Sequence, residues 1–191
     1  MITRTDLISM VYLPLTKKEI KEIVEQLVKE KFPVKTILEI SFSPDNQSSL
    51  HSALILEALF LKDYALLDPI LDDLFDKYNE IEYYATARTF GKLLTSIYKL
   101  RQNKKATSKM FKVTDGRYDD KIIEGCFKQI EDNDLKLSIA VWQLQLLTFF
   151  MNKKRKWIKE EVLVIINKIR KTDSPAVVAF TTKYLEKIKK L

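Results

Sequence analysis

Two side chains of this sequence belong to types that act as nucleophiles or as acid–base catalysts, His51 and Cys126. His51 is the only histidine, so a two-histidine metal site is impossible and acid–base catalysis by histidine would depend on it alone. It stands at the start of a helix that is apolar on most sides, where we expect a capping or packing role. Cys126 lies on the apolar stripe of its own helix without a His or Asn motif, which is typical of a small buried side chain. The sequence therefore predicts no catalytic residue.

Carboxylates occur in two clusters that could in principle hold a divalent cation. The first cluster, on one predicted helix, is Asp72, Asp73 and Asp76, and the second is Asp119 and Asp120 with Glu124. Neither forms a loop of alternating oxygen ligands such as an EF-hand. The sequence also contains no Gly-x-Gly and no Gly-Lys-Ser/Thr motif, so it lacks a phosphate-binding loop. We interpret the two clusters as solvated surface, and we predict neither a metal nor a cofactor.

Basic side chains give the sharpest candidate for binding. The candidate contacts for a partner or a nucleic acid lie in the second half of the chain, and they are Lys104, Lys105, Lys153, Lys154, Arg155, Lys156, Lys159, Lys183 and Lys187. If they share one face, they could contact phosphates in a salt-dependent manner, and Trp142 and Trp157 could stack on bases. Two observations weigh against this. Trp142 falls on the core stripe of its helix, and lysine lacks the bidentate fork of arginine.

The net charge of +7 is unevenly distributed along the chain. Residues 1–100 carry 12 Lys and Arg against 15 Asp and Glu, whereas residues 101–191 carry 21 against 11. This asymmetry is a hint of an acidic partner, but lysines that simply fill the solvent faces are the favoured explanation. The single cysteine excludes an intrachain disulfide. Neither a secretory signal nor an apolar run of ~18 residues is present, so we predict a cytoplasmic protein without a membrane segment.

Apolar side chains recur at helical spacing along nearly the whole chain, and only three glycines and five prolines interrupt it. Amphipathic segments alternate with segments that are apolar nearly all round, as stacked helix pairs require. About nine helices are expected, at 20–28, 34–42, 47–61, 66–78, 81–100, 122–130, 135–150, 158–169 and 175–191. Between the fifth and the sixth, residues 101–118 are polar and basic and predict a long loop.

The period of the pattern predicts a repeat architecture. The alanines Ala53, Ala87, Ala140 and Ala179 are separated by 34, 53 and 39 residues, and the longest interval contains segment 101–118. Repeats of about 40 residues with two helices are in the HEAT range. We predict an all-α fold, a right-handed α-solenoid of about nine helices in stacked antiparallel pairs. Residues 1–191 would form a single HEAT-like domain with a basic inter-repeat loop at about 101–118.

Two resemblances support this prediction. Residues 66–75 (LLDPILDDLF), followed by residues 83–94 (YYATARTFGKLL), resemble a HEAT repeat, although the Val-Arg pair usual at the start of the inner helix is missing. The chain also resembles a group of short bacterial helical proteins, through residues 32–40, 58–60, 157–158 and 179–185. Some of that group are labelled adenylosuccinate lyase. The lyase loop Ser-Ser-x-Met-Pro is absent, since Ser48 and Ser49 precede Leu50 and His51, and we do not expect that activity.

Two functions from different classes remain open at the level of sequence. The first is a non-enzymatic helical-repeat scaffold that binds a protein or peptide partner on its concave surface. The alternative is a nucleic-acid-binding HEAT-like module, similar to a DNA glycosylase, that uses the basic C-terminal half. An enzyme of the lyase type ranks behind both.

Overall fold

The computed structural model describes residues 2–132, 137–151, 155–171 and 175–189, and every regular element in these ranges is helical. The described part of the chain contains no β-strand, which confirms the all-α prediction. The described ranges contain eleven α-helices: α1 (Arg4–Tyr12), α2 (Lys17–Lys29), α3 (Val34–Ser41), α4 (Asn46–Lys62), α5 (Leu71–Asp76), α6 (Tyr84–Gln102), α7 (Ser108–Val113), α8 (Asp119–Glu131), α9 (Leu137–Leu147), α10 (Lys156–Arg170) and α11 (Pro175–Lys189). Among the connecting segments are the 3₁₀ helices η1 (Tyr64–Ile70), η2 (Tyr78–Glu80) and η3 (Thr148–Phe150).

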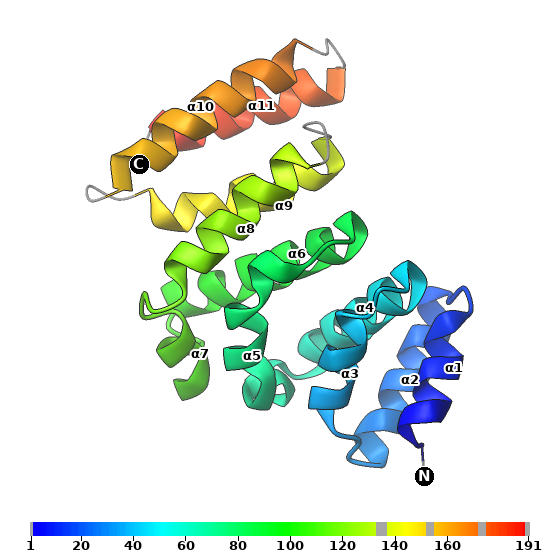
Figure 1. Ribbon diagram of the computed structural model, residues 1–191. Coiled ribbons are helices and arrows are strands. Elements are labelled where there is room, and N and C mark those ends of the chain that lie inside the picture. The colour runs from blue at the N-terminus through cyan, green and yellow to red at the C-terminus, as the bar shows by residue number, and fades with distance from the viewer. Residues whose placement is uncertain (1, 133–136, 152–154, 172–174, 190–191) are drawn as a thin grey trace.

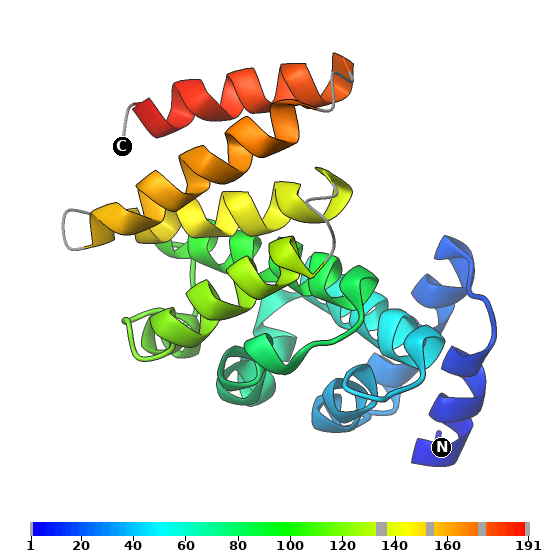
Figure 2. The same cartoon turned by 45° about the horizontal axis from the view of Figure 1, so that its top comes forward.

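The helices stack in order along the molecule, with the N-terminus and the C-terminus at opposite ends (Figures 1 and 2). Four helices form a continuous row, since α2 packs on α4, α4 on α6 and α6 on α9. Further helices pack on members of this row, α3 on α4 and α8 on α9. Helices α10 and α11 pair with each other. The hydroxyl of Tyr184 on α11 donates a hydrogen bond to the carbonyl of Leu144 on α9. The row α2–α4–α6–α9 therefore presents one shared face of successive helices.

Helix α1 was not expected, although its start carries a clear signal. The side chain of Thr3 accepts a hydrogen bond from the backbone N–H of Asp6, and the Asp6 carboxylate accepts one from the N–H of Thr3. This reciprocal capping box stabilises the first turn. Leu7 and Val11, four residues apart, are completely buried against the rest of the molecule. With only these two positions facing the core, a helix of this length shows too little periodicity to be recognised.

The segment predicted as one helix at 66–78 is divided into three pieces, η1, α5 and η2. Pro69 lies inside η1, where its missing N–H and its ring are incompatible with regular α-helical bonding. The α-helix therefore begins only at Leu71. The following helix was placed at 81–100, and α6 instead runs from Tyr84 to Gln102.

The segment predicted as a loop at 101–118 contains the last two residues of α6 and the whole of α7. Thr107 caps α7 by accepting a hydrogen bond from the N–H of Met110, and its hydroxyl donates one to Asp68 at 2.7 Å. Met110 and Val113 are completely buried. A helix of six residues is too short to show a period in the sequence, but these contacts attach it to η1 and the core.

The core face of α9 also differs from the prediction. Trp142 was placed on the core stripe but is only half-buried, and its neighbour Gln143 is completely buried instead. The reason is that α9 is apolar nearly all round, so the apolar pattern does not select one face. Trp142 consequently reaches the face shared by α4, α6 and α9.

Candidate groove between α2, α4, α6 and α9

A groove of about 480 Å³ lies on the shared face of α2, α4, α6 and α9, and we call it the inner groove. Its apolar part is formed by residues of α2, α4 and α9, namely Ile20, Leu54, Ala58, Leu61 and Trp142. Its polar part is formed by residues of α2, α4 and α6, namely Lys17, Glu57, Arg88, Thr89 and Lys92. Each of four helices thus contributes at least one side chain to the same depression.

The spacing of these residues explains why they meet. Leu54, Ala58 and Leu61 follow one another at four and three residues, so they lie on one face of α4. Arg88 and Lys92 are likewise one turn apart on α6. Because α6 packs between α4 and α9 (Figure 1), its two cations line the same groove as the apolar face of α4 and Trp142 of α9.

The charges of the inner groove are unbalanced. The ammonium group of Lys92 pairs with the carboxylate of half-buried Glu57 and lies 5.9 Å from the ring centroid of Trp142. This geometry combines an ion pair with a cation–π contact and fixes both side chains. Across the described ranges, neither Lys17 nor Arg88 takes part in an ion pair. One carboxylate therefore faces three cations.

Apolar surface is also left uncovered here. Leu61 is 73% exposed at the edge of the inner groove, and Leu54 and Ala58 are only partly buried. We predicted the helix at 47–61 as buried because it is apolar on most sides, and α4 is indeed buried over much of its surface. The remaining apolar positions of α4 are the ones that form the floor and edge of the inner groove, which the sequence pattern did not separate from the core.

The cations predicted from the sequence as contacts come from three elements. Lys104 and Lys105 are exposed in the turn after α6, Lys156 and Lys159 lie on α10, and Lys183 is exposed on α11. Lys153, Lys154 and the side chain of Lys187 lie outside the described residues.

Arg155 differs from the other predicted contacts because it is already engaged. Its guanidinium group contacts the carboxylate of Asp119 at 2.8 Å and that of Asp120 at 3.1 Å. These contacts join the start of α10 to the start of α8 and use the donors that a phosphate would need.

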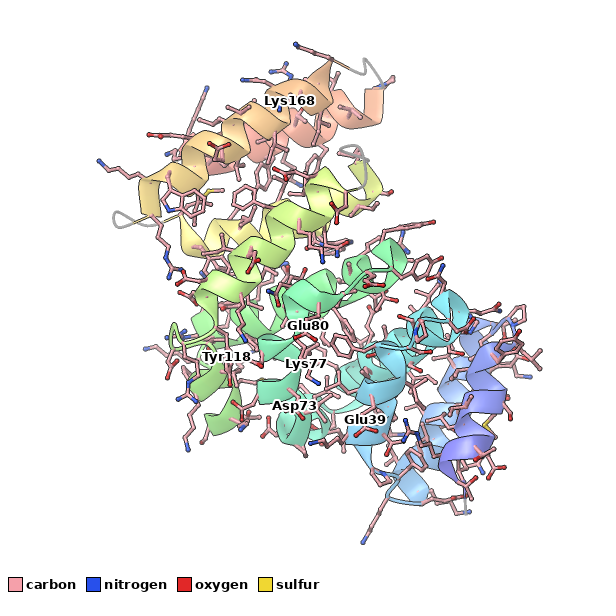
Figure 3. All side chains as sticks on the ribbon, in the orientation of Figure 1. Glu39, Asp73, Lys77, Glu80, Tyr118 and Lys168 are labelled. Carbon is pink, nitrogen blue, oxygen red and sulfur yellow. The ribbon has the colours of Figure 1, made fainter. Side chains whose placement is uncertain are left out.

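The aspartates of the carboxylate clusters considered as cation sites form ion pairs with residues of other helices. Asp72 and Asp76 of α5 pair with Lys109 of α7 and Lys121 of α8, and Asp73 pairs with Lys35 of α3 at 3.2 Å. The hydroxyl of Tyr118, a residue labelled in Figure 3, also donates a 3.0 Å hydrogen bond to Asp72. Part of the charge asymmetry has a structural explanation here, since lysines of the basic half pair with aspartates of the acidic half.

The two nucleophile and acid–base candidates have packing roles. His51 is buried, and its Nδ1 lies 2.7 Å from the carbonyl oxygen of Val11, so it joins α4 to the end of α1. Cys126 is completely buried, and burial raises the pKa of its thiol far above the ordinary range. A thiol in this environment stays protonated at neutral pH, and only the thiolate is nucleophilic. Neither side chain lines the inner groove.

Among the described helices, none has both the length and the apolar composition needed to cross a membrane.

Comparison of the chain with protein-family models, with curated proteins and with solved structures found no match.

Proposed function

We propose that this chain is a non-enzymatic scaffold, a right-handed HEAT-like α-solenoid in a single domain, that binds a protein or peptide partner in the inner groove. The stacking of successive helices supports this architecture, because the row α2–α4–α6–α9 would form the inner layer of such a solenoid. The expected concave surface is then the face that carries the inner groove.

The observation that carries the proposal is the combination of side chains in this groove. Trp142 and Arg88 belong to the residue types that contribute most binding free energy at protein interfaces. Leu61 adds exposed apolar surface, and the Glu57–Lys92 pair holds one wall in place. A rigid aromatic, an exposed leucine and an arginine without an ion pair suit a peptide segment that offers both apolar and polar side chains.

The alternative of nucleic-acid binding has weaker support. Of the predicted contacts, Arg155 is bound to two aspartates, and the lysines come from three separate elements. Trp157 is 49% exposed, but one face of its ring is stacked on Phe127, with the centroids 5.8 Å apart. The surface around Arg155 thus carries both signs of charge, which is unfavourable for a phosphate backbone.

Selection of short random peptides displayed on phage against the purified protein tests the proposal. We expect enriched peptides that bind the wild-type protein and Trp157→Ala, but bind Trp142→Ala at least about tenfold more weakly. Trp157→Ala is the matched control because it removes the second tryptophan of the chain, outside the groove. Circular dichroism verifies that both variants are folded.

Two results would contradict the proposal. The first is the absence of any enriched peptide whose binding depends on Trp142. The second is tight binding of labelled duplex or single-stranded DNA or RNA at about 0.15 M salt that is lost in Lys156→Glu and Lys183→Glu. That second result would assign the function to the basic C-terminal half instead.

A further inference from the structure

The geometry points to the chemistry of the partner: we infer that the inner groove binds an acidic peptide segment in which a carboxylate lies between two apolar side chains. The carboxylate would pair with Arg88, one apolar side chain would pack on Leu54 and Leu61, and the other would pack on Trp142. This inference rests on the proposed function and specifies the ligand of the same site.

The charges select an acidic ligand. Glu57 is already neutralised by Lys92, so the charges of Arg88 and Lys17 are left without a counter-charge in the part of the chain that is described. A basic peptide would meet repulsion from both cations, whereas a carboxylate can accept two parallel hydrogen bonds from the guanidinium group. Complementary charge thus selects the partner and its register.

The order of the helices sets the order of the ligand side chains. Because α6 lies between α4 and α9, a segment that crosses the groove meets the apolar face of α4 first, then Arg88, then Trp142. Neighbouring helix axes are ~8–10 Å apart, and an extended peptide advances ~3.3 Å per residue. The apolar residues would therefore lie about five or six positions apart, with the acidic residue near the middle.

Three fluorescein-labelled peptides of equal length provide the test. All carry a phenylalanine and a leucine at the inferred spacing, and the residues between these two are Asp and Glu in the first peptide, Ser and Gln in the second, and Lys and Arg in the third. Anisotropy titrations should show the acidic peptide binding at least about tenfold more tightly than the neutral one, and the basic one most weakly. The affinity for the acidic peptide should fall as the salt concentration rises.

A charge reversal on the protein gives the sharper readout. Arg88→Glu should lose the acidic peptide and gain affinity for the basic peptide, because it reverses the charge that faces the ligand. Arg88 is exposed, so we expect the variant to fold like the wild type. Arg170→Glu is the matched control, since Arg170 is exposed on α10, has no ion pair in the described part of the chain and lies outside the groove. It changes the net charge equally and should leave the order of the three peptides unchanged.

The outcomes separate the inference from the proposed function. Equal affinity for all three peptides, with binding lost in Trp142→Ala, would overturn the acidic preference and leave the groove as a peptide site. Binding of none of the peptides in a manner that depends on Trp142 would contradict both. Binding of single-stranded DNA that is lost in Arg88→Glu would overturn the inference by assigning the groove to nucleic acid.

Discussion

The hydroxyl of Tyr78 donates a 2.5 Å hydrogen bond to Oε1 of Gln143, between two completely buried residues that are 65 positions apart in the chain. Nε2 of Gln143 donates in turn to the carbonyl of Ala87 at 3.2 Å, so η2, α6 and α9 meet at one polar cluster. Burial raises the pKa of Tyr78 well above its ordinary value, so the hydroxyl remains a donor at neutral pH. This cluster fixes α9 relative to α6 and thereby positions Trp142, the residue next to Gln143, over the inner groove.

Removal of the donor should be costly. Tyr78→Phe leaves Oε1 of buried Gln143 with only the weak thiol donor of Cys126, at 3.8 Å, and we expect the free energy of unfolding to fall by about 1–3 kcal/mol. Gln143→Leu removes the acceptor as well, so the double variant should be more stable than the sum of the two single losses predicts, by about 0.5–3 kcal/mol. Urea unfolding of the four proteins measures this coupling. Additive losses would show that the two side chains do not interact.

Gly125 should not tolerate a side chain. A Cβ atom at this position of α8 would lie 2.7 Å from Cδ1 of Tyr78 and 3.1 Å from Cα of Asn79. In an exposed helix, Gly→Ala stabilises by about 1 kcal/mol. Here overpacking against a fixed ring and a backbone atom costs about 1–3 kcal/mol. We expect Gly125→Ala to unfold at lower urea than the wild type, whereas exposed Glu131→Ala on the same helix should be within about 0.5 kcal/mol. A stabilised Gly125→Ala would contradict this packing.

These contacts show what the sequence can and cannot predict about the fold. The period of apolar residues locates most helices, and Pro175 begins α11 as its first-turn preference predicts. The short α1 and α7 escape detection because two buried positions do not make a period. The sequence suggests that Gly91 is a glycine because a neighbouring helix packs closely on it. The structure agrees, since a Cβ at this position would lie 2.7 Å from Oε1 of Gln143. That the neighbour would be a buried glutamine is a tertiary contact that helical periodicity does not encode.

The inner groove was harder to predict than the fold. Leu54, Ala58 and Leu61 look like core residues in the sequence, because an apolar side chain on a helix that is apolar nearly all round is usually buried. Arg88 and Lys17 belong to the acidic half of the chain, so they are not part of the basic clusters that the sequence shows. Only the packing of α6 between α4 and α9 brings them together.

Arg155 should stabilise the packing of α10 on α8. Its guanidinium group contacts two aspartates from a half-buried position, and hydrogen bonds to charged groups contribute about 1.5–3 kcal/mol. Because Asp120 is almost fully exposed, we expect Arg155→Ala to cost only roughly 1–2 kcal/mol. Exposed Lys156→Ala is the control and should cost less than about 0.5 kcal/mol. Thermal unfolding measures both, and equal midpoints would show that the two ion pairs contribute nothing.

The stability should also depend on the charge of Asp72. The ammonium group of Lys109, together with the Tyr118 hydroxyl, lowers the pKa of this carboxyl in the folded state. Its contribution is therefore present above the ordinary pKa of about 3.9 and is lost as the pH falls through the lowered value. We expect Asp72→Asn to be less stable than the wild type at pH 7, by up to about 1 kcal/mol given its exposure, with a smaller difference near pH 3. Urea midpoints at the two pH values test this, and exposed Asp132→Asn serves as control. The same difference at both pH values would be contrary to a lowered pKa.

The fluorescence of Trp142 reports directly on whether a peptide occupies the inner groove. The chain has two tryptophans, so Trp157→Phe leaves Trp142 as the only one, next to Lys92 in the inner groove. Addition of a selected peptide should shift or quench this emission with the same dissociation constant as anisotropy gives. The signal should be lost in Leu61→Glu and retained in Leu13→Glu, which alters an exposed leucine outside the groove. Saturable peptide binding that leaves the Trp142 emission unchanged would show that the peptide binds outside the inner groove.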